Sequence, residues 1–135
     1  MLWPPGCAFS TSSGAPFDEL REREWLRDRR TAFDRLECMI RHTVAFRLRH
    51  PLGSAEEAAF LDAALVLANI AGVEKFERLA QVSPKNDYRF GFSMEFADQA
   101  AYDVYNTHPD HVAFVRDRWI PEVEDFLEID YTKLG

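Results

Sequence analysis

Two histidines beside Pro109 have a type and spacing that suit acid–base chemistry. A residue before proline is disfavoured in the helical conformation, and proline suits the first position of a helix, so His108 is expected to be an N-cap. His111 then lies in the first turn, where the positive end of the helix dipole disfavours imidazolium. A neutral imidazole is a usable general base near pH 7. The adjacent Asp110 acts in the opposite direction, so the net change in the pKa of His111 stays open at this point.

Tyr105 and His42 are expected to face the same cleft as His111. Tyr105 lies six residues before His111, near the end of the preceding helix, and a phenol can donate a hydrogen bond to a carbonyl or enolate oxygen. His42 lies on the covered side of a predicted strand. The candidate catalytic residues are therefore His111 as the base, Tyr105 as the donor that polarises a carbonyl, and His42 as their support. Residues that could bind an apolar or aromatic ligand are Phe46, Phe90, Phe92 and His108.

A structural interpretation of the same residues competes with this one. In it, the two histidines beside Pro109 only cap and fix a helix corner, and His42 is a core residue bonded to a carbonyl or to Tyr105. The spacing of His108 and His111 could also suit a metal ion, but no third ligand joins them, so neither a metal nor another cofactor is expected. The sequence has no nucleophile elbow, P-loop or dinucleotide-binding motif.

Composition limits the partners of the chain. It has 135 residues and a formal net charge of −7, with a pI near 5.1, and both nucleic acids and anionic membranes would favour a basic surface. No apolar run approaches the length of a membrane span. The first six residues carry no basic segment and no long apolar stretch follows them. With two cysteines, Cys7 and Cys38, that show no CxxC spacing, we expect reduced thiols in a cytoplasmic protein.

The composition changes near residue 39. Residues 1–16 are rich in proline, glycine, serine and threonine, and residues 18–37 are dominated by charge. We therefore expect residues 1–38 to be a disordered or marginally helical leader. Met39 is the expected natural start, which would make the leader an upstream translation; alternatively the leader is real and packs on a partner. The compact domain is expected to span residues 39–135.

Hydrophobic periodicity in residues 39–135 predicts a β-α-β-β-α-β order. Apolar and polar residues alternate over 40–48, as in a half-buried strand. A helix follows, with a capping box at Ser54–Glu57 and Gly72 at its end. Strands are expected over 73–82 and 88–96, helices over 98–106 and from 109 to about 119, with an interruption at Pro121, and a last strand around 127–132. This order predicts an α+β, ferredoxin-like fold with a four-stranded antiparallel sheet.

The two faces of this sheet are expected to differ. Large aromatic residues map to one face, which the helices should cover, whereas small and charged residues map to the other. Leu127, Ile129 and Tyr131 also map to that second face and do not suit full exposure to water. A partner is therefore expected there, most simply a second copy in a symmetric homodimer.

Several motifs together resemble one family. They are Met39–Phe46 as an opening strand, Gly72-Val73-Glu74 with the later Ser83-Pro84 as a second strand and turn, the pattern Tyr105-x-x-His108-Pro109-x-His111-x-x-Phe114, and Asp130-Tyr131 in the last strand. In order and spacing they are similar to the stress-responsive A/B barrel (Dabb) family over essentially all of 39–135. The resemblance implies a dimeric α/β barrel, in which the sheets of two copies face each other.

The resemblance implies less about activity. Most members of the family are associated with stress responses without an established reaction. Plant polyketide cyclases related to olivetolic acid cyclase share the fold and hold a tyrosine and a histidine in the cleft, which by motif position resemble Tyr105 and His111. A strand histidine there resembles His42. The expected function is a homodimer with an apolar cleft that binds a small molecule, with cyclase, lyase or isomerase-like chemistry. The alternative is a non-enzymatic, stress-associated dimer with structural histidines.

Overall fold

The alternating residues 40–48 form the first strand of a sheet, as predicted. The computed structural model describes residues 38–134. Its main elements are β1 (Ile40–Leu48), α2 (Ala55–Ala63), β2 (Glu74–Ala80), β3 (Phe90–Phe96), α3 (Gln99–Thr107), α4 (Pro109–Phe114), α5 (Ile120–Glu122) and β4 (Val123–Thr132). A 3-10 segment, Ala64–Asn69, continues α2, and a π-helical segment, Val115–Trp119, joins α4 to α5.

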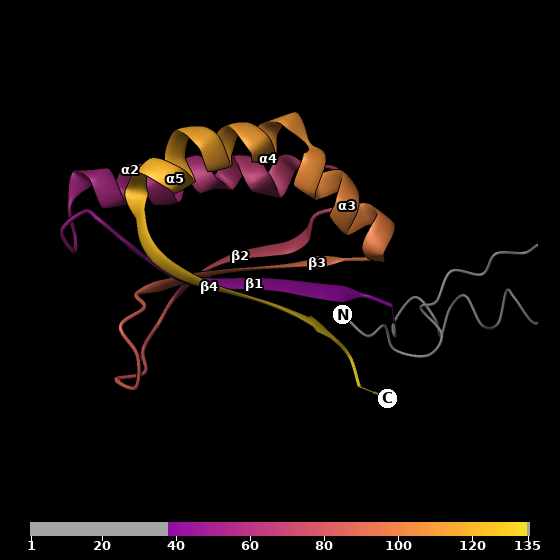
Figure 1. Cartoon of the computed structure of the whole chain (residues 1–135), viewed down its shortest axis with the longest axis horizontal. Helices are drawn as coiled ribbons and strands as arrows, with labels where there is room; N and C mark the ends of the chain where they lie inside the picture. Colours follow the sequence, from indigo (N-terminus) through magenta and orange to yellow (C-terminus); the bar gives the residue numbers. More distant parts are fainter. Residues whose placement is uncertain (1–37, 135) are drawn as a thin grey trace, which may run out of the picture.

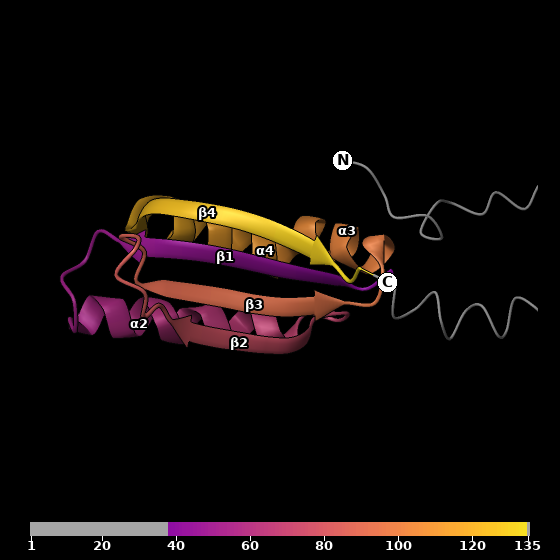
Figure 2. The same ribbon diagram turned by 90° about the horizontal axis from the view of Figure 1, so that it is seen from below.

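The four strands lie in the order β2-β3-β1-β4, and all neighbours are antiparallel. The helices cover one face of this sheet (Figure 1). Seen from the other side, α2 lies behind β2 and β3, whereas α3 and α4 lie behind β1 and β4 (Figure 2). The predicted α+β, ferredoxin-like fold is therefore confirmed.

Local signals place most element ends where they were expected. The Ser54 side chain accepts a hydrogen bond of 3.2 Å from the Glu57 N–H, and the Glu57 carboxylate reaches back to Gly53 N at 3.1 Å, one residue before the expected partner. Asp98 caps α3. The prediction that Pro121 interrupts the last helix is wrong, because α5 contains this proline. A π-helical segment, Val115–Trp119, directly precedes α5, and Pro121 lies in the first turn of α5.

The helix-covered face carries the aromatic core, as expected. Alternate β1 side chains, including His42 and Phe46, are buried there. The ring centroids of Phe46 and Phe92 lie 4.7 Å apart, and Phe60 of α2 packs on Phe46 at 5.7 Å. These packed rings bury large apolar area, and they fix how the helices sit over the sheet.

The opposite face of the sheet, called the open face below, has no helix over it in the described part of the chain (Figure 2). It carries small and charged β1 residues such as Ala45 and Arg41. On β4 it carries Leu127, Ile129 and Tyr131, which are 48%, 38% and 52% exposed. The predicted division of residues between the two faces is therefore confirmed.

Three expectations concern the remainder of the chain or its surroundings. Residues 1–37 of the expected leader lie outside the described residues, and so does Cys7. The expectation of reduced thiols is wrong for Cys38, which is disulfide-bonded. Among the described helices, none has the length and apolar character needed to cross a membrane.

Candidate active site

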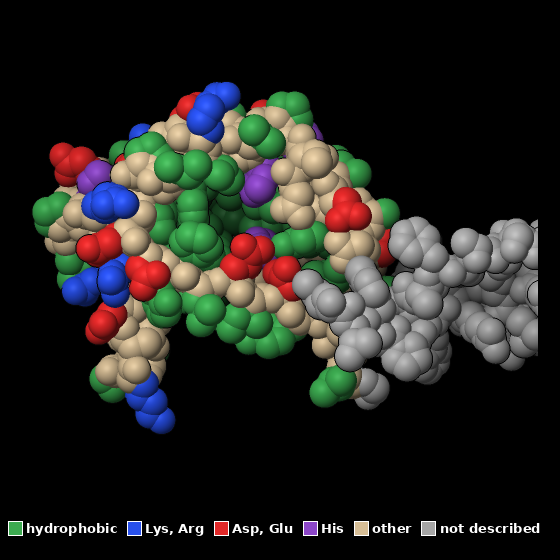
Figure 3. Space-filling view, in the orientation of Figure 1, with side chains coloured by type: hydrophobic (Ala, Val, Ile, Leu, Met, Phe, Trp, Pro, Cys, Tyr) green, Lys and Arg blue, Asp and Glu red, His purple; other side chains and the backbone are tan. Residues whose placement is uncertain are grey.

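A cavity of about 320 Å³, called the cleft below, lies between the helices and the sheet. In the space-filling view it is a hollow with hydrophobic walls and histidine at its rim (Figure 3). Apolar side chains from both layers form most of its wall: Val44, Leu67, Phe92, Met94, Phe114, Val115, Trp119, Ile120 and Phe126. The polar lining consists of His42, Tyr105, Asn106, His111 and Glu128. An apolar cavity with a few convergent polar groups is typical of a small-molecule site.

Tyr105 and His111 meet in this cleft because α3 ends and α4 begins between them. His108 is the shared cap, and its Nδ1 accepts a hydrogen bond of 3.1 Å from the Asp110 N–H, which confirms the predicted N-cap. The corner brings the Tyr105 and His111 rings to a centroid separation of 4.3 Å. The motif therefore places two titratable rings side by side in an apolar cavity.

The hydrogen bonding of His111 leaves one ring nitrogen available as a base. Its Nδ1 lies 3.1 Å from the backbone oxygen of Asn106. A carbonyl can only accept, so Nδ1 must carry the proton and Nε2 has a free lone pair in the neutral ring. Burial lowers the pKa of His111, although the bond to the Asn106 carbonyl acts in the opposite direction. The net direction is a lowered pKa, which favours the neutral imidazole.

The Tyr105 hydroxyl is an available donor. The side chain is buried, with 2% of its surface exposed. Burial, and then the charge of Glu128, raise the pKa of Tyr105, so its hydroxyl keeps its proton. Within residues 38–134 no hydrogen bond of this hydroxyl is present. Tyr105 lines the cleft, where a ligand oxygen could accept a hydrogen bond from this hydroxyl.

His42 belongs to a polar cluster on β1, β4 and α3. Its Nδ1 lies 2.6 Å from Asp130 Oδ1, directly across the β1–β4 pairing. The Tyr102 hydroxyl lies 2.9 Å from Asp130 Oδ2 and 3.1 Å from Glu128 Oε1. Burial, with the nearby carboxylates, raises the pKa of Tyr102. These contacts fix the plane of the His42 ring, so the other nitrogen keeps a defined position at the cleft.

The same cluster has the donor set of a metal site. His42, Glu128 and Asp130 each offer one ligand atom, and these atoms lie within 4.8 Å of one another. Their hydrogen bonds with each other and with Tyr102 account for the arrangement without an ion. His108 and His111, considered above as a metal pair, belong to no such group in the described residues.

The cleft contains part of the predicted site. It brings together His42, Tyr105, His111 and, from the ligand-binding candidates, Phe92. Phe46 is fully buried in the core, Phe90 lines a groove at the end of the sheet, and His108 caps α4, so these three lie outside the cleft lining.

Sequence reasoning missed three polar residues of the site: Tyr102, Glu128 and Asp130. The alternation of the last strand contained a signal for two of them. Glu128 and Asp130 lie on the side opposite Leu127 and Ile129, and thus on the helix-covered face. Carboxylates there need a buried partner, and the predicted His42 was available.

Comparisons with known proteins agree with this architecture. The family model described as the stress responsive A/B barrel domain matches residues 40–133. A Dabb family protein of Mesorhizobium loti, with a ferredoxin-like fold, is 69% identical, with a TM-score of 0.70 over 72% of this chain and 98% of its own. A search of curated proteins found no match.

Two more distant structures share the fold. One is a dimeric protein of unknown function from Bacteroides fragilis, 23% identical, with a TM-score of 0.58 over 73% of this chain and 99% of its own. The other is the hydroxynitrile lyase of Passiflora edulis, 16% identical, with a TM-score of 0.65 over 73% of this chain and 96% of its own. With the family match over residues 40–133 and the 69% identical relative, the chain belongs to the stress-responsive A/B barrel (Dabb) family.

Proposed function

We propose that this protein binds a small, largely apolar carbonyl compound in the cleft and carries out acid–base chemistry on it, as a lyase, isomerase or cyclase. The observation that carries the proposal is the pairing of the Tyr105 hydroxyl and the His111 imidazole, 4.3 Å apart between ring centroids, inside a cavity of about 320 Å³. One group is a proton donor and the other a proton acceptor; Tyr105 is buried and His111 is partly buried.

In the proposed reaction, His111 Nε2 removes a proton from the carbon next to the carbonyl or from a hydroxyl on the reacting carbon. The Tyr105 hydroxyl donates a hydrogen bond to the oxygen on which negative charge develops, and it keeps its proton because its pKa is raised. His42, held by Asp130, supports the polar end of the cleft. Proton removal of this kind starts aldol-type bond formation, bond cleavage and isomerisation alike.

The fold is compatible with such chemistry. The hydroxynitrile lyase of Passiflora edulis is a lyase built on it. At 16% identity this likeness concerns the fold alone, so the proposal rests on the side chains in the cleft.

The test is turnover and binding with a panel of aromatic and β-keto compounds, for wild type, His111→Ala and Tyr105→Phe. We expect both substitutions to lower turnover by about 10²–10⁴-fold, the range for loss of a general base or an oxyanion donor. His108→Asn, which keeps a capping side chain outside the cleft, is the control and should retain activity. If both cleft variants bind and turn over the panel like wild type, the enzymatic proposal fails.

The alternative is a non-enzymatic dimer with structural histidines. Contacts of other histidines favour it: His50 Nε2 lies 2.7 Å from Glu122 Oε1, and His108 caps α4. This alternative predicts that no compound of the panel binds and that His111→Ala only lowers stability. NMR chemical shift changes of cleft residues on addition of a compound from the panel would argue against this non-enzymatic alternative.

We also propose that the protein is a homodimer through its open face. Leu127, Ile129 and Tyr131 are between 38% and 52% exposed there, and they form an apolar strip along β4. The Bacteroides fragilis protein with this fold is dimeric. Burying the strip against a second copy would remove its apolar surface from water.

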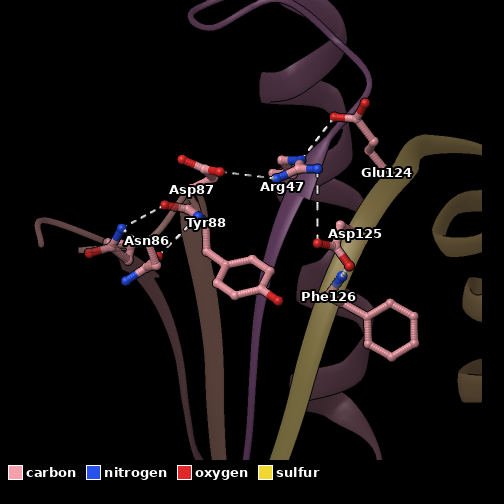
Figure 4. A network of polar contacts seen from close by, with 8 residues as sticks. Arg47, Asn86, Asp87, Tyr88, Glu124, Asp125 and Phe126 are labelled. Carbon is pink, nitrogen blue, oxygen red and sulfur yellow. Dashed lines mark hydrogen bonds and ion pairs between the residues drawn. The ribbon is translucent and has the colours of Figure 1, made fainter. Parts of the chain in front are cut away.

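Charges at the two ends of the open face favour one arrangement of the copies. At one end, the exposed Arg41 and Lys75 share the buried Glu95, at 3.0 and 3.2 Å. At the other end, Arg47 pairs with three acids, Asp87, Glu124 and Asp125, at 3.9, 3.0 and 3.9 Å (Figure 4). A two-fold axis that crosses the strands would place the exposed Arg41 and Lys75 of one copy over the acids around Arg47 of its partner.

Sedimentation equilibrium of the full chain tests the dimer. We expect a dimer at micromolar concentration that weakens as salt is raised, because salt screens the charges at the two ends. A monomer at all concentrations and salt levels would rule the proposal out.

Two further expectations are kept as proposals. The domain is proposed to span residues 39–135, which limited proteolysis would test by cleavage before residue 39. The proposed compartment is the cytoplasm. Cell fractionation would test it.

A further inference from the structure

We infer that the cleft accepts uncharged carbonyl compounds and that Glu128 excludes the corresponding carboxylate anions. This inference rests on the proposed function only in that the cleft binds a ligand at all. It adds the charge class of the ligand and a residue that determines it.

Glu128 is a partly exposed residue of the cleft wall. It lies on β4, an edge strand, on the same side as Asp130, and it lines the cleft with a side chain that is 47% exposed. The Tyr102 hydroxyl donates to its Oε1 at 3.1 Å, which holds the carboxylate in place. Acidic side chains lie beside the hollow in the space-filling view (Figure 3). Glu128 therefore presents a negative charge both to solvent and to the interior of the cleft.

Positive charge that could offset Glu128 is scarce around the ligand. No lysine or arginine is among the residues of the described chain that line the cleft. Of the two lining histidines, His111 is held neutral by burial, and His42 already faces the carboxylate of Asp130 at 2.6 Å. A carboxylate entering the cleft would therefore leave water without gaining a cation, and it would meet a fixed like charge.

Hydrogen bonding alone does not distinguish an uncharged carbonyl compound from a carboxylate. The Tyr105 hydroxyl, which has no partner within residues 38–134, can donate equally well to a ketone oxygen or to a carboxylate oxygen. The charge of Glu128 decides between them. The volume of about 320 Å³ is at the lower end of ligand sites, which suits a single aromatic ring with a short substituent.

The experiment measures binding of acetophenone and benzoate, which share the ring and differ in charge, to the full chain. Wild type should bind acetophenone at least about tenfold more tightly than benzoate. Glu128→Gln, whose amide oxygen can still accept from Tyr102, should reduce this ratio to within about threefold, mainly through tighter benzoate binding. Glu56→Gln, which removes the same charge from an exposed position on α2, should leave the ratio as in wild type. Added salt should also narrow the ratio in wild type.

The outcomes separate the two proposals. Equal binding of benzoate and acetophenone to wild type, or an unchanged ratio in Glu128→Gln with native circular dichroism, would overturn the role of Glu128 while leaving the cleft as a binding site. If neither compound causes chemical shift changes at residues of the cleft, both the binding proposal and this inference fail. A shift of the ratio in Glu56→Gln equal to that in Glu128→Gln would mean that net charge, rather than Glu128, sets the preference.

Discussion

His42 Nδ1 lies 2.6 Å from Asp130 Oδ1, and the two residues stand directly opposite each other on β1 and β4. Their pairing joins the central part of the sheet to its edge strand at the base of the cleft. Because His42 is 7% exposed, the contact is poorly screened by water and serves both stability and the orientation of the imidazole ring.

Removing the Asp130 carboxylate should therefore destabilise the protein. Asp130→Asn removes the charge and replaces by an NH2 group one of the two oxygens that bond His42 Nδ1 and the Tyr102 hydroxyl. We expect a decrease of about 1.5–3 kcal/mol in the free energy of unfolding, as for hydrogen bonds to charged groups. Asp62→Asn is the control, since its carboxylate is 76% exposed and pairs only with Arg78 on the surface; it should cost less than about 1 kcal/mol. Urea denaturation at neutral pH measures both, and equal effects would contradict a special role for the buried pair.

Two tyrosines on α3 should respond differently to the loss of a hydroxyl. The Tyr102 hydroxyl has acceptors at 2.9 and 3.1 Å, so Tyr102→Phe should cost about 1–2 kcal/mol of stability. Tyr105→Phe should leave stability within about 0.5 kcal/mol of wild type, because no hydrogen bond of this hydroxyl is present in residues 38–134. Thermal unfolding of both variants checks this. A large loss in Tyr105→Phe would show that its hydroxyl is structural.

The lowered pKa of His111 makes stability depend on pH. Burial lowers the pKa of folded His111 below the ordinary histidine value of about 6.5. Between these two pKa values the unfolded chain binds a proton that the folded chain does not. Stability from this residue is fully present above about pH 6.5 and decreases as the pH falls below it, with a slope of at most about 1.4 kcal/mol per pH unit. Urea midpoints of wild type and His111→Gln between pH 5 and 7.5 should converge toward acid pH. A constant difference would contradict the shift.

A charge placed in the apolar strip of the open face should separate the proposed dimer. Leu127→Glu adds a carboxylate at a position that is 48% exposed in the single chain, and burying it in an interface would be unfavourable. We expect sedimentation to show a folded monomer. Val104→Glu is the control on the helix side, at 55% exposure, and it should remain dimeric. Dissociation of both variants alike would argue against the open face as the interface.

A substitution at Gly72 tests the end of the first helical region. Its φ of +93° lies in the left-handed region, which side chains rarely adopt. Gly72→Ala should lower the free energy of unfolding by about 1–2 kcal/mol because of backbone strain. A clash is not the cause, because a Cβ there would lie at an ordinary contact distance of 3.6 Å from the Ala101 Cβ. Thermal unfolding provides the measurement, and an unchanged midpoint would contradict it.

Local patterns predicted the strands, the caps and the division of the sheet faces, because each depends on residues close in sequence. The alternation over 40–48, the Ser54 and Asp98 caps and the His108-Pro109 corner are of this kind. Tyr105 and His111 lie on either side of this corner, so their proximity could be predicted from the sequence alone. The cluster around His42 was not predicted, because Tyr102 and Asp130 lie 60 and 88 residues away from it in the chain. Their contact depends on the register of β4 and on the angle of α3, which tertiary packing decides.

The register of β4 decides which of its side chains lie on the helix-covered face and which lie on the open face. Between Arg47 and Leu48 the β1–β4 pairing shifts by a residue, so that Asp125 and Val123 are the successive partners and Glu124 is extra. Beyond this point, Glu128 and Asp130 lie on the helix-covered face, where Glu128 lines the cleft, while Leu127 and Ile129 lie on the open face. A slip of one residue would exchange the two sets completely. Natural insertions or deletions in this strand should therefore be rare or come in pairs. The proposed ligand selection and the proposed self-association could each change by substitutions at alternate positions without disturbing the other.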